Sequence, residues 1–450
     1  QCAQALSAAC KVDIAEDASL DRPVKRRNQL LALFCLLAFA GLGVLYFQHW
    51  VVQKPFGIVL FIGEGLAPSR IAATRAFAGG ADNPLAIESL PYSALLKNFS
   101  EDFATPDSAS AATALATGVK VNNRAIGIDA TGKSLRNLFE LAKAAGRATG
   151  IVTDGRLTDA AVAAFYGHSH TQDGSETLAR QLTEQPALDV ALGGGDAGFT
   201  PAEKGGERND GRDLLLELRR NGWEVVQTRA ELEAVPAWKR AKVFGAFSPT
   251  ELAYSDDTSA RATQPSLGDM VRRAIELLQY NRTGYLLVVD AALMRKAAQD
   301  NQGEHTLSET VELDRAVAVA RRYVGENSMI IVCGDVAVGG LTMSGAPFRK
   351  DHGIALLGLN ASGDPWLSWA TGPNATTSYG AARFAEPTVS PSPGEDLPLA
   401  RPPQEPAAFY SKSALYTVED MIAFGSGDGS ESLHGSIDNT AIFAIIRAKL

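Results

Sequence analysis

Two kinds of hydrophobic pattern divide the chain. Residues 30–47 form one uncharged run rich in Leu, Ala and Phe. After Pro55 the apolar runs are short and end near glycine or aspartate: FGIVLFIGEG, ATGIVTDG, LDVALGGG, GYLLVVDAA and SMIIVCGD. Short continuous runs of this kind are typical of strands buried on both faces of a parallel sheet.

Amphipathic segments lie between these predicted strands: SLRNLFELAKAAG, DGRDLLLELRRNG and SLGDMVRRAIELLQ. Alternating strands and helices predict an α/β domain over residues 55–450, with a large, mostly parallel sheet covered on both faces. Functional sites in such sheets form at the carboxyl ends of the strands, where Asp154, Asp290 and Asp335 fall. The Pro-, Glu- and Ser-rich stretch 382–406 is expected to be a surface excursion.

The first apolar run has the length of a membrane span. Eighteen residues at about 1.5 Å each cover roughly 27 Å, close to the hydrocarbon thickness of a bilayer. We therefore expect one N-terminal transmembrane helix over residues 29–50. A cleaved signal peptide has a similar pattern, but no clean Ala-x-Ala site follows the run, which favours an uncleaved anchor.

Basic residues before the apolar run set the expected orientation. Lys25, Arg26 and Arg27 precede it, and Tyr46 and Trp50 mark an aromatic edge at its end. By the positive-inside rule, residues 1–28 are a cytoplasmic tail and the domain lies on the periplasmic or an equivalent extracytoplasmic side. The chain is thus expected to be a single-pass membrane protein, in a bacterial periplasm or a eukaryotic lumen.

Composition narrows the classes of partner. The formal net charge of −9 argues against an extended nucleic-acid surface, so we expect no nucleic-acid partner. There are four cysteines. Cys35 and Cys333 lie in apolar runs, while Cys2 and Cys10 are either a pair or, as we favour, free thiols on the tail.

Seven segments, in order, resemble the alkaline phosphatase family, in its bacterial type: FIGEGLAPS, TPDSASAATALATGVKVNNRAIGID, LFELAKAAGRATGIVT, LDVALGGGDAGF, NDGRDLLLELRRNGWEVV, SETVELDRAVAVA and LHGSIDNTAIF. The resemblance runs from about Phe56 to the C-terminus. It implies a three-layer αβα sandwich and a metal-dependent phosphomonoesterase with a serine nucleophile, two zinc ions and one magnesium ion.

The resemblance places Asp107 and Ser108 at the family's nucleophile. A serine followed by small residues is suited to a helix N-terminus, where backbone N–H groups favour an anion. The alternative is that Ser108 is only a helix cap retained for folding, and without the rest of the site this interpretation is favoured.

Most zinc ligands implied by the resemblance are replaced. The histidine that should follow Asp335 is Val336. The leaving-group zinc loses its ligands to Arg295, Gln299 and Tyr416, so zinc is not expected. Arg295 also brings a positive charge to the position of a dication.

The magnesium position is half kept. Glu64, Asp159 and Asp290 match carboxylate positions of the family, and Asp335 lies nearby. Glu64 is one methylene longer and Asp290 one shorter than the family's residues, so these four carboxylates could hold a hard cation such as Mg²⁺ or Ca²⁺.

The position of the family's phosphate-binding arginine is changed as well. The family's arginine falls on Gln172, which lacks the charged fork, and Arg295 could partly replace it. His168 and His170 would share one face of a strand and could suit a metal, although ordinary loop histidines are the favoured interpretation.

These losses lead to a degenerate phosphatase as the expected function. The chain is predicted to be a membrane-anchored pseudoenzyme, a binding or structural subunit in a membrane complex with another protein or as a homodimer. The alternative is a weak phosphomonoester hydrolase that uses Ser108 with a hard cation. A third interpretation is a receptor that binds a phosphorylated ligand without turnover.

Overall fold

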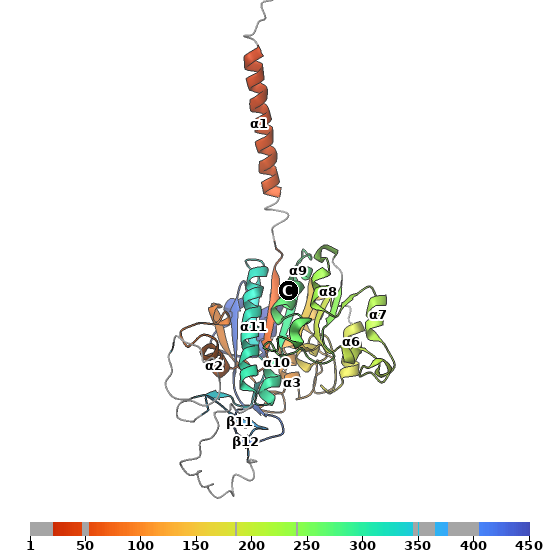
Figure 1. Cartoon of the computed structure of the whole chain (residues 1–450), viewed down its shortest axis with the longest axis vertical. Coiled ribbons are helices and arrows are strands. Elements are labelled where there is room, and N and C mark those ends of the chain that lie inside the picture. Colours follow the sequence, from red (N-terminus) through yellow and green to blue (C-terminus); the bar gives the residue numbers. More distant parts are fainter. Residues whose placement is uncertain are drawn as a thin grey trace, which may run out of the picture. The chain divides into compact units, whose positions relative to one another are not determined.

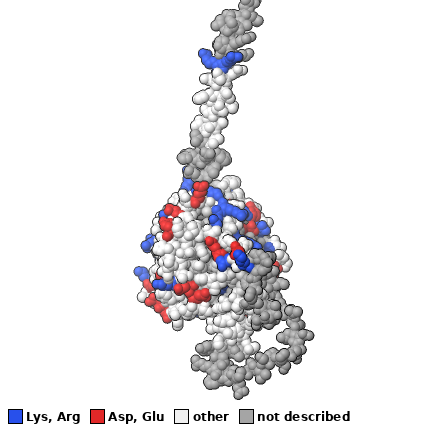
Figure 2. All heavy atoms as spheres, turned by 90° about the vertical axis from the view of Figure 1, so that its left-hand side faces the viewer, with Lys and Arg blue, Asp and Glu red and all other residues white. Residues whose placement is uncertain are grey.

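The computed structural model describes residues 21–46, 54–184, 187–239, 242–344, 350, 365–376 and 405–450. The chain divides into two compact units, residues 1–54 and 55–450. In the first unit, α1 (Asp21–Tyr46) contains a stretch, Arg26–Val44, that is long and apolar enough to cross a membrane, although a signal sequence can meet the same criteria. Figure 2 shows that, beyond the basic residues at its start, the described surface of this helix carries no charge.

α1 begins earlier than the expected span. Its first turns contain basic residues, which are good helix formers. The helix therefore extends beyond its apolar part. The helix is described up to Tyr46, and the end expected at Trp50 lies outside the described residues.

A ten-stranded sheet forms the centre of the second unit, in the spatial order β15-β2-β14-β8-β1-β7-β3-β4-β6-β5. Neighbouring strands are parallel except for β14, which runs antiparallel to β2 and β8. The prediction of a large, mostly parallel sheet is therefore confirmed. The strands are β1 (Gly57–Gly63), β2 (Tyr92–Lys97), β3 (Ala148–Arg156), β4 (Val190–Gly194), β5 (Glu224–Val226), β6 (Val243–Ala246), β7 (Tyr285–Ala291), β8 (Met329–Gly334), β14 (Met421–Ser426) and β15 (Ser436–Asp438).

Helices cover both faces of the sheet, as expected for a three-layer sandwich. α9 and α11 pack side by side on one face (Figure 1), while α3, α4 and α12 contribute to the core on the other. The helices of this unit are α2 (Pro68–Ala78), α3 (Ser108–Thr117), α4 (Leu138–Ala144), α5 (Ala160–Ala163), α6 (Ser175–Glu184), α7 (Leu214–Arg220), α8 (Arg229–Ala234), α9 (Leu267–Leu278), α10 (Leu293–Gln299), α11 (Gly303–Tyr323) and α12 (Thr440–Arg447).

Strand β1 shows why its apolar run is continuous. Side chains alternate between the two faces of a strand, and both faces are covered here. Ile58, Leu60 and Ile62 belong to one core, whereas Val59 and Phe61 belong to the other. A run without polar residues is the pattern that this position requires.

Two small sheets follow β8 at the carboxyl-end edge of the large sheet. β9 (Ala337–Val338) pairs with β13 (Tyr416–Thr417), and β10 (Thr342–Met343), β11 (Leu367–Gly372) and β12 (Ala407–Tyr410) form the other. The excursion expected at 382–406 lies outside the described residues apart from its last two positions.

Candidate active site

Ser108 is the first residue of α3, and Asp107 is the N-cap. Asp107 Oδ1 accepts the backbone N–H of Ser110 at 2.9 Å, and Oδ2 accepts the backbone N–H of Arg124 at 2.7 Å. These bonds satisfy free donors of the helix and fix the loop that follows it. Ser108 is thereby held, only 3% exposed, with its hydroxyl facing the end of β1.

Glu64, directly after β1, is the central group of the site. Ser108 Oγ donates to Glu64 Oε2 at 3.3 Å, and Arg295 Nε donates to the same oxygen. Glu64 is fully buried, and its burial raises the pKa of the carboxyl group although Arg295 acts to lower it. Oε1 has no hydrogen-bond partner among the described residues.

Arg295 bonds to Gln299, another of the residues expected at the leaving-group zinc position. Arg295 and Gln299 lie one turn apart on α10, and Arg295 Nη1 donates to Gln299 Oε1 at 3.0 Å. Burial acts to lower the pKa of Arg295, but Glu64 and neighbouring groups raise it overall. The guanidinium is therefore a permanent cation inside the site.

Tyr416 reaches the same place from β13. Burial raises the pKa of its hydroxyl, while Arg295 and a hydrogen bond with Ser108 act in the opposite direction. The phenol therefore stays neutral and serves as a hydrogen-bonding group beside the serine. Tyr416 and Arg295 reach the site from segments that are far apart in sequence.

Two further carboxylates, Asp290 and Asp335, are buried next to Glu64. Asp290 Oδ2 accepts the hydroxyl of Thr153 at 2.8 Å, and Asp335 Oδ1 accepts the backbone N–H of Val336 at 2.6 Å. The other oxygen of each carboxyl group has no partner within the described part of the chain. Burial and the nearby Glu64 charge raise the pKa of both acids well above the ordinary value.

A polar cavity of about 350 Å³ lies over this cluster. Its lining includes Ser108, Asp159, Gln172, Arg295 and Tyr416. The structure thus brings together the residues expected to form the nucleophile, the phosphate contact and one metal position. Asp159 Oδ2 accepts the backbone N–H of Arg156 at 2.9 Å, so this carboxylate also shapes the loop before α5.

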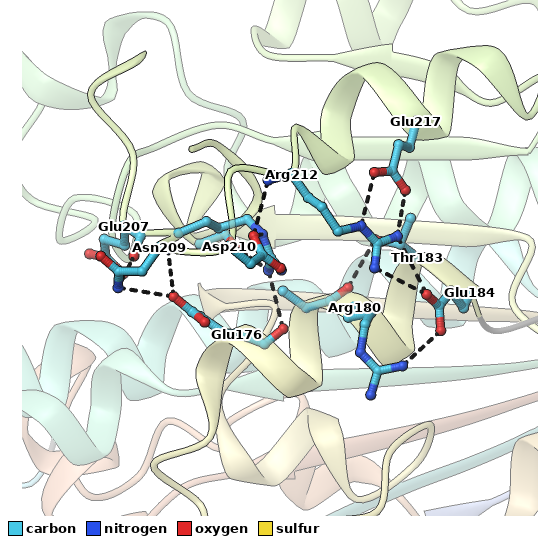
Figure 3. A network of polar contacts seen from close by, with 12 residues as sticks. Glu176, Arg180, Thr183, Glu184, Glu207, Asn209, Asp210, Arg212 and Glu217 are labelled. Carbon is cyan, nitrogen blue, oxygen red and sulfur yellow. Dashed lines mark hydrogen bonds and ion pairs between the residues drawn. The ribbon is translucent and has the colours of Figure 1, made fainter. Parts of the chain in front are cut away.

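A network of ion pairs supports the cavity from the side. Ser175, the first residue of α6, lines the cavity. Figure 3 shows α6 tied to the segment before α7: Glu184 accepts from Arg180 at 3.0 Å and contacts Arg212 at 3.4 Å. Glu176 Oε1 accepts the backbone N–H of Asn209 at 2.8 Å. These contacts fix α6, whose N-terminus faces the cavity together with that of α3.

The family's two-zinc arrangement does not fit these residues. Val336 is fully buried and packs in an apolar cluster with Ala111 and Leu307, so it offers no ligand. Arg295 donates to Glu64 Oε2, so its positive charge lies beside the carboxylate that was expected to bind a metal. In the ranges that the structure describes, no three His, Cys, Asp or Glu side chains are arranged to hold a metal ion. Glu64 Oε1, Asp290 Oδ1 and Asp335 Oδ2 have no hydrogen-bond partner among the described residues, and burial raises the pKa of all three acids.

The two histidines singled out by their spacing occupy a loop beside an isolated β-bridge. His168 Nδ1 lies 2.8 Å from the carbonyl of Gly127, and its backbone N–H donates to Gln181 Oε1 at 2.7 Å. His170 packs against Gly132. Their contacts agree with the favoured interpretation of ordinary loop histidines.

A second buried acidic group was not identified from the sequence as a site. Asp154 Oδ1 accepts the backbone N–H groups of Ala292 (2.7 Å) and Leu293 (3.1 Å), so it anchors the start of α10. Burial, with a contribution from Glu309, raises the pKa of Asp154 to about 8, and burial raises that of Glu309 to about 7. The sequence pointed to Asp154, which lies near the end of β3, but gave no signal for Glu309, which lies in a helical pattern.

Comparisons with known proteins agree with the fold. The family model "Alkaline phosphatase" matches residues 57–450. The chicken (Gallus gallus) tissue-nonspecific alkaline phosphatase is 29% identical, over 86% of this chain and 83% of the relative. Alkaline phosphatase H of Pseudomonas aeruginosa is 33% identical, over 63% and 70%.

Solved structures give the same answer at the level of architecture. The Thermus thermophilus alkaline phosphatase superposes with a TM-score of 0.68 at 24% identity, covering 89% of this chain and 92% of that structure. The enzyme from the Antarctic bacterium TAB5 gives 0.67 at 20% identity, covering 88% and 98%. With its family model, its relatives and its fold in agreement, the chain belongs to the alkaline phosphatase family.

Proposed function

We propose that the chain is a membrane-anchored pseudoenzyme of this metal-dependent family, which binds an anionic group in the Ser108 cavity without efficient turnover. One observation carries the proposal: the Arg295 guanidinium is bonded to Glu64 at the place where a catalytic dication would act. At about 4 Å and an effective dielectric near 20, a unit positive charge repels each unit of charge on a metal ion by roughly 4 kcal/mol, so it repels a dication by roughly 8 kcal/mol. Zinc binding is therefore disfavoured by charge as well as by the missing ligands.

The binding role is supported by the charges around the cavity. Ser108 and Ser175, the first residues of α3 and α6, line it together with Arg295 and Arg156. Helix N-termini and arginine side chains favour phosphate-like anions. Gln172 adds an uncharged donor where the family has an arginine. These groups can hold and orient a phosphoryl group.

The step of phosphate-ester hydrolysis that these residues would stabilise least is departure of the leaving group. If Ser108 Oγ bonded to phosphorus, the ester oxygen would leave with a developing negative charge. In the family a zinc ion stabilises that charge. Here Arg295 is already engaged by Glu64 and Gln299, so it offers little of this stabilisation.

A weak phosphomonoester hydrolase is the second candidate. The observation in its favour is the 3.3 Å hydrogen bond from Ser108 Oγ to Glu64 Oε2, which gives the hydroxyl a proton acceptor. In this version a hard cation, Mg²⁺ or Ca²⁺, would bind near Glu64, Asp159, Asp290 and Asp335.

A hydrolysis assay on the purified full chain separates the two. We expect turnover of an aryl phosphate in the presence of Mg²⁺ or Zn²⁺ to be near background and unchanged in Ser108→Ala, while inorganic phosphate still binds to the wild type. Turnover that Ser108→Ala abolishes would establish the weak hydrolase instead.

The membrane setting forms part of the proposal. It is supported by the apolar stretch of α1 and the basic residues Arg26 and Arg27 at its start, which favour a cytoplasmic N-terminus and an extracytoplasmic domain. The partner is expected to be a membrane protein or a second copy of the chain. Cross-linking in intact membranes, followed by purification of the full chain, tests this: recovery of the chain alone, as a monomer, would contradict a subunit role.

A further inference from the structure

The edge of the sheet opposite the Ser108 cavity has its own chemical character. We call it the strand-start edge, because the parallel strands begin there. The chain enters the domain at this edge: Phe56 precedes β1, and its carbonyl accepts the N–H of Tyr285, the first residue of β7, at 3.3 Å. Glu64 and Asp290, in contrast, lie where these two strands end.

Exposed basic residues gather at the strand-start edge. Each helix that precedes a parallel strand ends there, and several of these ends carry Lys or Arg. The exposed basic residues are Lys54, Lys143, Arg219, Arg220, Lys239, Arg282, Arg321, Arg322 and Arg447. Exposed acidic residues at the same edge are fewer: Glu184, Glu224, Glu326, Asp428 and Glu431. Because the whole chain has a net charge of −9, this basic excess is local.

Exposed aromatic side chains share the edge. Trp238 is 69% exposed, Tyr280 39% and Tyr92 38%. Trp and Tyr are enriched where one end of a side chain meets lipid and the other meets water. Basic residues interspersed with Trp and Tyr form the pattern of a surface that lies on lipid headgroups.

A recess in the same edge fits one headgroup. Its volume is about 550 Å³, and it lies between the ends of α4 and α9 and the starts of β3 and β4. Lys143 and Arg282 contribute positive charge to its lining, and Asp189 contributes a carboxylate that pairs with Lys143 at 3.3 Å. Leu277, Leu278 and Val190 make the lining partly apolar. A phospholipid could place its phosphate group beside the cations and its glycerol region against the leucines.

The short linker between α1 and the domain limits how far the strand-start edge can lie from the membrane. The sequence places eight residues, 47–54, between the end of α1 and Pro55. A fully extended chain of that length spans roughly 30 Å. We propose that the strand-start edge docks on the surface of a membrane rich in anionic phospholipid, with the Ser108 cavity on the far side. This inference rests on the proposed membrane anchor.

The test uses the full chain with a protease site inserted after Gln53. The chain is reconstituted into vesicles of phosphatidylcholine alone or with phosphatidylglycerol, cut, and floated on a gradient. Before cutting, flotation with both kinds of vesicle tests the anchor by itself, so that failure of the anchor is seen separately. After cutting, we expect the domain to leave neutral vesicles, to stay on anionic ones, and to be released by high salt.

Charge reversal sharpens the test. Arg282→Glu, Arg321→Glu and Arg322→Glu together should lower partitioning to anionic vesicles at least tenfold, since each basic residue near such a surface contributes about fivefold. A matched triple at the opposite edge, with Lys133, Arg136 and Lys412 each changed to Glu, should have little effect. Equal release from both kinds of vesicle, or retention that the first triple leaves unchanged, would overturn the proposal. Unchanged thermal unfolding checks that both triples fold.

Discussion

Two segments that meet at Ser108 differ in what their side chains do. In the nucleophile segment, Asp107 caps α3 and fixes the following loop, so the fold itself needs it. In the segment from Asp290 to Gln299, two positions that the family resemblance assigns to metal ligands line the cavity, and their side chains bond to no backbone group of the described residues there. These are the positions that have become Arg295 and Gln299. Under the proposed function, a motif stays complete for structural reasons while the chemistry around it is lost.

The largest effect is expected when the metal ligands implied by the family resemblance are restored, and the measured quantity is phosphomonoesterase activity. The variant with Arg295→Asp, Gln299→His, Val336→His and Tyr416→His replaces one cation with three imidazoles and a carboxylate. We expect phosphomonoesterase activity in zinc to rise on the order of 10²–10³-fold, since single electrostatic contributors are typically worth that much. Adding Ser108→Ala should abolish the gain. A folded, zinc-loaded variant without added activity would show that more than the ligands has been lost.

Arg295 is expected to be the strongest single contributor to stability in the site. Arg295→Met leaves Glu64 buried without its cation, which should lower the free energy of unfolding by about 3 kcal/mol in chemical denaturation. Lys296→Met is the matched control: the neighbouring side chain is 43% exposed and pairs with Glu251, so its loss should cost under about 1 kcal/mol. Equal effects would mean that Glu64 does not depend on the guanidinium, and Glu64→Gln should rescue the first variant.

Asp107 should be more important for folding than Ser108. Asp107→Ala removes the acceptor of two backbone N–H groups, and we expect it to lower the free energy of unfolding by about 2 kcal/mol. Ser108→Ala keeps those bonds and should change it by less than about 1 kcal/mol. Denaturant titrations of both variants decide this. If Ser108→Ala lowered the free energy of unfolding more than Asp107→Ala, helix capping could not explain why Asp107 and Ser108 are both present.

The smallest effect is expected in the pH dependence of stability, through Asp154. Its pKa in the folded state is raised to about 8, so the folded chain binds more protons than the unfolded chain between about pH 4 and pH 8. Stability contributed by this group therefore falls as pH rises through that window. Asp154→Asn keeps the acceptor for Ala292 and Leu293, and should stabilise the domain at pH 8 relative to pH 5 by at least about 1 kcal/mol. An unchanged pH profile of thermal unfolding would contradict this.

The sequence predicted the fold well, because its signals were local. The buried strands β1 and β8 are continuous apolar runs, and the predicted helix in SLGDMVRRAIELLQ is α9, with a capping box at Ser266. The cavity residues Ser108, Gln172 and Arg295 were also expected together, through the family resemblance. The bonding of Arg295 to Glu64 could not be predicted, since it depends on the side-chain directions of a residue on α10 and a residue just after β1, which are far apart in sequence. The proximity of Glu309 to Asp154 was missed for the same reason, because Glu309 lies on α11.

The zinc content of the purified chain tests the central claim most directly. After incubation with excess zinc and removal of the free metal, elemental analysis should find well under one zinc per chain, because Arg295, Gln299, Val336 and Tyr416 leave no tetrahedral ligand set. Two zinc ions per chain, together with aryl phosphate hydrolysis that Ser108→Ala abolishes, would contradict the account.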